Sequence, residues 1–411
     1  MHTSCLPHPH WQPPFTHFDT EMPDKTTYGL FNDSFPPVLD GVTLTVENYC
    51  KWLTASGHKV CVVTPWAPQS PPHPDFEMYR YLSLPIYNRH PYRYGYPRFD
   101  PFIWRKLRRQ PFRIVHAHCP FSSGRLAAYA SRYHDIPLVT TFHSKYRTDL
   151  ERSLPAPMVR YQMKRLLDFY NAATEVWIPQ AAVEETLREY GYRGKVTVVD
   201  NGNDFAEGIT DIDDYKRLSR ETLGIRPSTL VLLFVGQHIL EKGIEIIIRA
   251  LASLKGVDYR MHFIGVGYAL DDMRRLSETL GISANVTFHG SILDRETLRR
   301  YYAAADLFLF PSFYDNAPLV VREAAAMQTP AILPEGSTAA ERMRHAHNGF
   351  LTQRTPQAYA EAITALAADR SLITTAGRGA RATLSRSWRD VMDEVINRYR
   401  EIIERHEAAR H

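Results

Sequence analysis

Two acidic residues, Asp315 and Glu323, stand eight positions apart in the stretch PSFYDNAPLVVREAAAM. Asp315 follows the apolar run LFLFPS, which predicts a strand, and Glu323 falls about two turns into the helix expected next. Carboxylates at these two places can face one cleft and accept hydrogen bonds from the neighbouring hydroxyls of a sugar or a ribose. The positions between them that open the helix, whose N–H groups can cradle phosphate or sugar oxygens, are Asn316, Ala317, Pro318 and Leu319. A helix cap plus a surface glutamate is the simpler alternative, but such a cap does not need the loop SFYDNAP.

A second segment, GQHILEKG, has the composition of a phosphate-binding loop. Gly236 and Gln237 end an apolar run, and Lys242 stands at the start of the next expected helix. A lysine together with the N–H groups of a helix start suits a diphosphate. A solvent-exposed lysine is the alternative, but the helix dipole disfavours a cation at this end unless an anion lies nearby.

Histidines and a glycine mark two further candidate positions. His143 ends the run IPLVTTFH, where a parallel strand would present it to a ligand, although an isolated histidine is more often structural. His116 and His118 end the neighbouring run RIVHAH, but no carboxylate or cysteine lies at ligand spacing, so we do not expect a metal site. Gly41, in the loop NDSFPPVLDGV, would let a phosphate approach the backbone, and an ordinary strand-to-helix loop is the simpler explanation.

Alternating strands and helices must position these residues. Runs such as 27–31 and 59–65 indicate buried strands separated by helices, and the same rhythm restarts at 229–236. Strands alternating with helices imply right-handed βαβ units and a parallel sheet. The sequence therefore predicts an α/β protein of two Rossmann-like, doubly wound domains. Ligands would bind at the carboxyl ends of the strands, in the cleft between the domains.

Composition places the domain boundaries. Residues 1–25 are rich in Pro and His, and we expect them to be disordered. The first domain is expected over 26–205 and the second over 226–385. Residues 206–225 are polar and charged and indicate a linker, in which the acidic cluster beginning at Asp211 fits a helix cap better than a metal site.

Length and charge bound the class of protein. The chain has 411 residues, a formal net charge of +4 and a pI of about 8.7, with 44% hydrophobic and 23% charged residues. This is enough for two full cores and fits an anionic ligand or a membrane surface, without indicating nucleic acid. Neither a secretory signal nor a membrane-spanning run is expected. The cysteines, which show no CxxC spacing and are expected to be reduced thiols, are Cys5, Cys50, Cys61 and Cys119.

In this order and spacing, the four segments resemble the family 4 glycosyltransferases, which have the two-domain GT-B fold. The resemblance runs from about residue 26 to the C-terminal helices. The family's Glu-x7-Glu motif matches as Asp315-x7-Glu323, which implies that Asp315 holds the donor sugar and Glu323 the ribose. The family's phosphate loop matches at Gly236 and Lys242, with Gln237 in place of the family's arginine.

The resemblance also covers the acceptor side and the nucleobase. Gly41 matches the glycine loop of the acceptor domain, and His143 matches the active-site histidine. Gly290, within FHGSI, matches the segment that lines the nucleobase. The fold also implies that residues 386–411 form a helix that leaves the second domain and packs on the first.

The resemblance implies a retaining, metal-independent hexosyltransferase with His143, Lys242 and Asp315 as its catalytic residues. A glucosyl or mannosyl unit would pass from a nucleotide-sugar donor to a hydroxyl of a lipid or glycan, by front-face displacement. A UDP-sugar is the favoured donor and GDP-mannose the other. No cofactor, metal or nucleic-acid partner is expected. We expect a cytoplasmic protein. The basic, aromatic helix over 158–170 fits two roles about equally well: a solvated helix face, or a contact with the inner face of the membrane.

Two other functions fit the same scaffold. A sugar-nucleotide epimerase would convert UDP-N-acetylglucosamine with no acceptor present. A non-catalytic nucleotide-sugar-binding subunit is motivated by Gln237 and Asp315, which depart from the family's residues. Lys242, Glu323 and His143 argue for the transferase.

Overall fold

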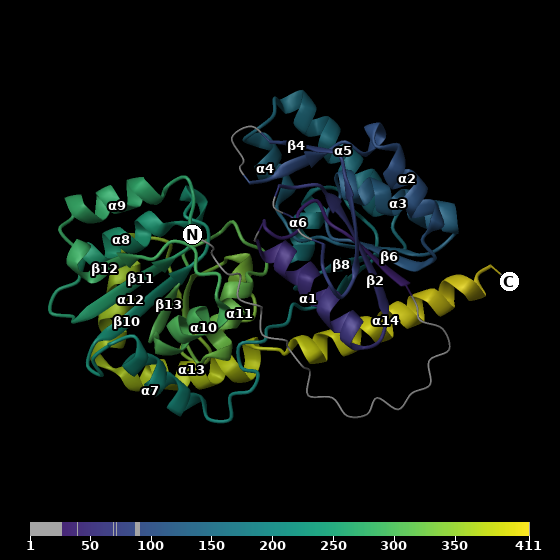
Figure 1. The fold of residues 1–411 in the computed structure, drawn as a ribbon. Coiled ribbons are helices and arrows are strands. Elements are labelled where there is room, and N and C mark those ends of the chain that lie inside the picture. Colours follow the sequence, from purple (N-terminus) through teal and green to yellow (C-terminus); the bar gives the residue numbers. More distant parts are fainter. Residues whose placement is uncertain (1–26, 39, 69, 71, 87–90, 411) are drawn as a thin grey trace, which may run out of the picture.

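The structure, a computed structural model, describes residues 27–410 apart from 39, 69, 71 and 87–90. The disorder predicted for residues 1–25, and Cys5, lie outside the described residues. Two α/β domains lie side by side, the first built from the N-terminal half of the chain and the second from the C-terminal half (Figure 1).

The first domain is built on a seven-stranded parallel sheet with the order β3-β2-β1-β6-β7-β8-β9. Its strands are β1 (Thr27–Phe31), β2 (Lys59–Pro65), β3 (Glu77–Tyr81), β6 (Phe112–Ala117), β7 (Leu138–Thr141), β8 (Glu175–Ile178) and β9 (Val196–Val198). Every residue of β1 is buried, because helices cover both faces of the sheet. This is why the central strands appear in the sequence as unbroken apolar runs.

The second domain repeats the design with six parallel strands in the order β12-β11-β10-β13-β14-β15. They are β10 (Leu230–Val235), β11 (Tyr259–Ile264), β12 (Val286–Phe288), β13 (Leu307–Leu309), β14 (Ala331–Pro334) and β15 (Phe350–Thr352). In each sheet the strand order reverses beside the first strand, β1 or β10, which is where doubly wound sheets bind ligands. The predicted fold of two doubly wound domains is confirmed.

Helices cover both faces of each sheet. Those of the first domain are α1 (Gly41–Ala55), α2 (Pro101–Arg109), α3 (Ser122–His134), α4 (Tyr146–Glu151), α5 (Ala156–Asn171) and α6 (Val183–Glu189). Those that follow are α7 (Ile212–Thr222), α8 (Ile244–Ser253), α9 (Leu270–Thr279), α10 (Arg295–Ala304), α11 (Leu319–Ala326), α12 (Pro356–Ala368), α13 (Arg370–Leu384) and α14 (Trp388–Ala408). In the first domain α2, α3 and α5 pack on one face of the sheet, and α1 and α14 pack on the other.

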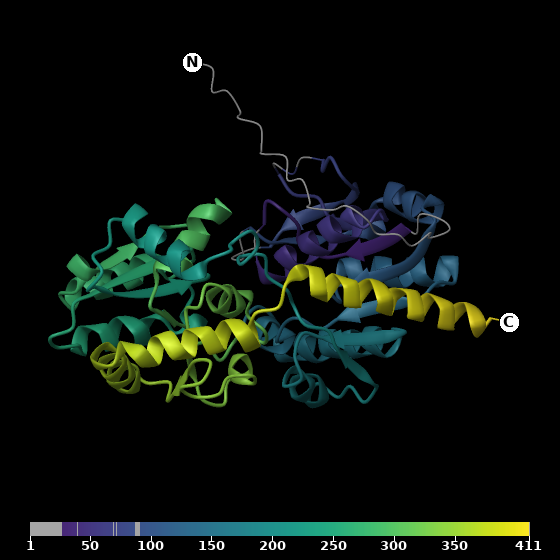
Figure 2. The same cartoon turned by 90° about the horizontal axis from the view of Figure 1, so that it is seen from below.

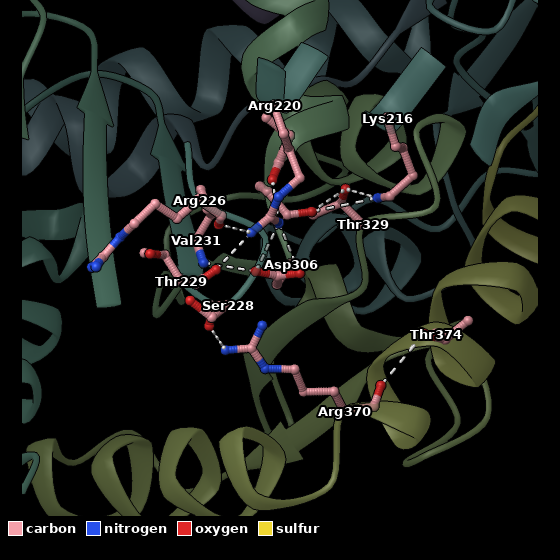
Figure 3. A network of polar contacts seen from close by, with 12 residues as sticks. Lys216, Arg220, Arg226, Ser228, Thr229, Val231, Asp306, Thr329, Arg370 and Thr374 are labelled. Atoms are coloured by element: carbon pink, nitrogen blue, oxygen red, sulfur yellow. Dashed lines mark hydrogen bonds and ion pairs between the residues drawn. The ribbon is translucent and has the colours of Figure 1, made fainter. Parts of the chain in front are cut away.

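The segment expected to be a linker, 206–225, contains the helix α7, and that helix packs on the second domain. Asp211 caps α7, as the sequence predicts, by accepting from the N–H groups of residues 213 and 214. Arg220 pairs with Asp306 at 3.1 Å, and Lys216 donates to the carbonyl of Met327 at 3.1 Å (Figure 3). Burial lowers the pKa of Lys216 to about 8. A polar sequence here reflects a helix that docks through charged side chains, which composition cannot separate from a solvated linker.

The chain crosses between the domains twice, at neighbouring places. Asn203 donates its N–H to the Arg386 carbonyl at 2.9 Å, and Trp388 donates back to the Asn203 carbonyl at 3.2 Å. Beyond this point α14 returns to the first domain and lies along it (Figure 2). Its residues Trp388 and Tyr399 are buried in one core with α1 and the central strands.

A long excursion between β3 and β6 carries structure that the sequence does not mark. It contains the antiparallel pair β4 (Ser83–Pro85) and β5 (Arg93–Gly95), a 3-10 turn (Pro97–Phe99) and α2. These elements are short and mix apolar with charged residues, so they lack the apolar runs that reveal the other strands.

Within the described part of the chain, no helix is long and apolar enough to cross a membrane. Cys50 and Cys61 are buried free thiols, and Cys119 is a free thiol at intermediate depth.

Candidate active site

Lys242 and Asp315 meet in the second domain, on loops that follow the neighbouring strands β10 and β13. The Lys242 Nζ lies 2.5 Å from Asp315 Oδ1, and Ser312 Oγ donates to Asp315 Oδ2 at 2.6 Å. The two charged side chains are only 11% and 17% exposed, so water and salt screen the pair weakly. Two of the predicted catalytic residues therefore form one charged pair, which an anion bound to Lys242 would open.

Gly243 fixes the spacing of these two loops. It caps α8 with a φ of 71°, and a Cβ at this position would lie 2.9 Å from the Pro311 carbonyl oxygen. Gly236 begins the same loop at the end of β10. The loop GQHILEKG thus packs directly on the loop that carries Asp315.

Glu323 lies on α11 and is 6% exposed. Tyr302 Oη donates to its Oε2 at 2.8 Å. Burial raises the pKa of Glu323, while the positive charge of Arg295 and the Tyr302 hydrogen bond oppose that rise. Glu323, the second acid of the motif, is thus held by a hydroxyl donor and a nearby cation, and a carboxylate can accept further hydrogen bonds.

Gly290, the residue expected to line the nucleobase, lies after β12. Its carbonyl accepts a hydrogen bond from the Gly265 N–H at 2.8 Å.

The start of α11 has no side-chain cap. Pro318 is the N-cap residue, with extended backbone and no side-chain hydrogen bond to the helix, and Ala317 and Leu319 flank it. The first N–H groups of a helix have no partner inside the helix, so they suit a ligand oxygen. Asn316 points elsewhere: its Nδ2 donates across the cleft to the His143 carbonyl at 3.0 Å.

His143 reaches the cleft from the first domain, directly after β7. Its Nε2 lies 3.1 Å from His118 Nδ1, and the His118 ring stacks on His116 with 4.0 Å between centroids. His116 Nδ1 in turn lies 2.5 Å from Tyr399 Oη of α14. The pair His116 and His118 therefore supports His143. The sequence already indicates that His116 and His118 lie on one face, because residues two apart on a strand point to the same side.

These three histidines predict a stability that depends on pH. Burial lowers the pKa of His143 to about 3 and lowers the pKa values of His116 and His118 well below 6.5. In the unfolded chain histidine has a pKa of about 6.5, so the unfolded state binds more protons below that pH. We therefore expect these histidines to cost no stability above about pH 6.5, where they are neutral in both the folded and the unfolded state. Below that pH, each histidine should lower the free energy of unfolding by about 1.4 kcal/mol per pH unit, until the pH reaches the pKa of that histidine in the folded protein.

Urea unfolding between about pH 7.5 and about pH 5 measures this slope. The double variant H116Q/H118Q should flatten it, because glutamine does not titrate. An equal slope in the variant and the wild type would contradict the assignment.

Two hydrogen bonds link Gln237 of the second domain to the residue that precedes Gly41 in the first domain. Gln237 Nε2 donates to Tyr92 Oη at 3.3 Å, and Tyr92 Oη donates to Asp40 Oδ2 at 3.0 Å. Asp40 also caps α1 by accepting from the Thr43 N–H at 2.7 Å. A carboxylate therefore occupies the helix start where the sequence suggests a phosphate. A Cβ at Gly41 would meet no atom of the described residues within 4 Å.

A buried ion cluster near the crossing of the chain is not evident from the sequence. The Asp200 carboxylate pairs with Arg322 on one oxygen and with Arg342, at 2.6 Å, on the other. Arg322 stands beside Glu323 on α11, whereas Asp200 follows β9 of the first domain. This cluster ties the end of the first sheet to the helix that carries the acidic motif.

Among the described residues, no group of three or more His, Cys, Asp or Glu side chains is placed to hold a metal ion.

Two protein-family models match most of the chain: "Glycosyltransferase Family 4" over residues 39–207 and "Glycosyl transferases group 1" over residues 216–383. Alpha-monoglucosyldiacylglycerol synthase of Streptococcus pneumoniae is 26% identical, over 74% of this chain and 70% of its own length. GDP-mannose-dependent alpha-mannosyltransferase of Corynebacterium glutamicum is 25% identical, over 90% of this chain and 88% of its own.

Solved structures share the fold. Sucrose-phosphate synthase from Thermosynechococcus elongatus superposes with a TM-score of 0.77 at 20% identity, covering 92% of this chain and 99% of that one. Anabaena HepE, solved in complex with UDP-glucose, gives a TM-score of 0.73 at 18% identity, covering 91% of this chain and 99% of that one.

Proposed function

The chain belongs to the family 4 glycosyltransferases with the GT-B fold, and we propose that it is a retaining hexosyltransferase acting on a lipid or glycan hydroxyl. The observation that carries this proposal is the meeting of two half-sites. His143 of the first domain and the Asp315 loop of the second are joined by the hydrogen bond from Asn316 to the His143 carbonyl. A buried lysine stands in the same loop cluster.

Charge explains the part that each residue would take. A nucleotide-sugar diphosphate would draw Lys242 away from Asp315 and free that carboxylate for the hydroxyls of the sugar. Glu323 would accept hydrogen bonds from the ribose. The low pKa of His143 keeps its ring neutral, so it can hydrogen-bond the sugar without adding a charge.

The proposed step is a front-face displacement. The acceptor oxygen bonds to the anomeric carbon on the face from which the diphosphate leaves, and the acceptor proton passes to an oxygen of the departing phosphate. The configuration at the anomeric carbon is thereby retained. The protein contributes position and charge stabilisation, with Lys242 and the uncapped start of α11 facing the leaving group.

A ligand screen tests the donor. Melting temperatures are measured with UDP, GDP, ADP and their sugars, with and without magnesium. A ligand that binds only the folded state adds about 2.7 kcal/mol at roughly a hundredfold excess over its dissociation constant. We expect one nucleotide, with UDP favoured over GDP, to raise the melting temperature equally with and without magnesium. The absence of any shift would contradict the proposal.

Product analysis separates the transferase from its two alternatives. With the donor identified, NMR of the product reports the anomeric configuration, and retention is expected. Conversion of UDP-N-acetylglucosamine without an acceptor would indicate an epimerase. Donor binding without transfer to any lipid or glycan acceptor would indicate a binding subunit.

Replacing Gln237 by arginine should strengthen donor binding. Gln237 is uncharged and donates to Tyr92, so it gives the diphosphate no ionic contact. A charge-assisted hydrogen bond exceeds a neutral one by about 1 kcal/mol, which corresponds to roughly fivefold in affinity. Calorimetric titration with the nucleoside diphosphate measures the change. The control is Q237E, which should weaken binding, and equal affinities of all three proteins would place Gln237 outside the donor site.

A further inference from the structure

Large apolar side chains are exposed along one stretch of the first domain. Leu82, beside β4, and Leu84, within it, are 46% and 55% exposed. Phe99, in the 3-10 turn before α2, and Phe102, in the first turn of α2, are 69% and 73% exposed. We call this surface, together with the arginines described next, the β4–α2 face. It lies on the side of the first domain away from α14 (Figure 1). Single exposed apolar residues are common, but a cluster of this kind indicates an interaction surface.

The same stretch is strongly basic. Between residues 93 and 109 there are six basic residues and one acidic residue, Asp100. Asp100 already caps α2, accepting from the N–H groups of Phe102 and Ile103. It also accepts from the Leu82 N–H at 3.1 Å. The one negative charge of the stretch is therefore used within the fold.

Four arginines of this face project into solvent without a carboxylate partner among the described residues. They are Arg98, Arg105, Arg108 and Arg109. Two exposed arginines of the second domain differ: Arg249 pairs with Glu245, and Arg275 pairs with Asp272, one helical turn away. The positive charge of the β4–α2 face is thus not neutralised by its own helix, and it remains available to an anionic partner.

The helix α2 combines both features on one side. Ile103 and Leu107 are buried against the sheet. Phe102, Arg105 and Arg109, spaced by three and four residues, share the opposite side of the helix. An apolar ring surrounded by arginines suits the boundary between lipid headgroups and acyl chains.

The helix over 158–170, for which membrane contact is one of the two roles suggested by the sequence, exposes less apolar surface than the β4–α2 face. As α5 it buries Val159, Met163 and Leu166 in the core of the first domain, and only Met158 and Tyr161 of its large apolar residues are exposed. Most of its apolar side is therefore used in folding.

We propose that the β4–α2 face docks the enzyme on an anionic lipid bilayer. The inference rests on the proposed function in one respect, since a lipid acceptor would be drawn from that bilayer. Leu82 and Leu84 add aliphatic surface, which acyl chains accommodate, whereas the phenyl rings of Phe99 and Phe102 suit acyl chains and bases alike. The attraction is partly Coulombic, so it weakens as salt rises.

Vesicle sedimentation with the full chain tests this proposal. The wild type should sediment with vesicles of phosphatidylcholine and phosphatidylglycerol, should not sediment with phosphatidylcholine alone, and should be released by salt. The variant R105E/R108E/R109E should bind at least about a hundredfold more weakly, since each lost basic residue near the surface removes about a factor of five. A second variant, F99S/F102S, should also bind more weakly, with all four arginines retained.

The matched control is R249E/R274E/R275E, which makes the same change of charge on α8 and α9 of the second domain. It should bind vesicles as tightly as the wild type. Equal loss in the control, or equal binding by both β4–α2 variants and the wild type, would overturn the proposal. So would binding to heparin or DNA without binding to vesicles. The rise in melting temperature with nucleotide is measured on the same proteins. A rise without vesicle binding would contradict only the docking surface, and vesicle binding without a rise would contradict only the transferase.

Discussion

Replacing Lys242 by alanine is expected to lower the rate of sugar transfer by roughly a hundred- to a thousandfold, the range seen when one charge-stabilising donor is removed from an active site. Lys242 is 9% exposed and pairs with Asp315. Without it, the Asp315 carboxylate would face the donor diphosphate with no cation between them. The proposed mechanism places the largest single charge contribution on this residue.

The measurement is the transfer rate at saturating donor, together with the melting temperature of the variant. Lys255→Ala is the matched control, because this lysine is exposed on the turn after α8 and should leave the rate unchanged. A folded K242A protein with an unaltered rate would remove Lys242 from the mechanism.

Replacing Asp200 by alanine is expected to be the most destabilising single change in the charged clusters described above. The Arg322 side chain is 7% exposed, and without Asp200 its guanidinium would stay buried without its carboxylate. Breaking a buried ion pair by removing one partner costs about 3–5 kcal/mol. Arg342→Ala should cost less than about 1 kcal/mol, because Arg342 is 45% exposed and water can replace its partner.

Urea unfolding of the two variants tests this order. Asp213→Ala is the control, since Asp213 is 65% exposed and its contact with Arg378 is long, at 3.7 Å. If D200A and D213A lost the same small amount of stability, Asp200 would not couple the domains. Because the cluster joins β9 to α11, D200A should also weaken the donor-induced rise in melting temperature.

The two-domain architecture can be predicted from the sequence because burial on both faces leaves a local trace. A strand covered by helices on both sides must be apolar throughout, as β10 is, so LVLLFV is recognisable without a structure. Strands without that burial leave no such trace. In β3, EMYRY has one buried residue, and the sequence gives no sign of it or of the β4–β5 pair.

The candidate site divides in the same way. Glycines, lysines and acids at the ends of apolar runs identify the loops around Lys242 and Asp315, because parallel strands bring their carboxyl ends to one edge. The hydrogen-bond partners of these residues cannot be predicted in this way. Nothing in the composition pairs Gln237 with Tyr92, 145 positions away.

By itself, the sequence determined the alternation of strands and helices, the two doubly wound domains and the loops that carry the candidate residues. These depend on periodicity and spacing over a few residues, which the local chain contains. Only the packing of the whole chain brings Asp200 to Arg322 across 122 positions, docks α7 on the second domain, and leaves four arginines of the β4–α2 face without a carboxylate partner among the described residues. The physical reason is that a charge acquires its partner, or remains without one, only when packing fixes which distant surfaces touch.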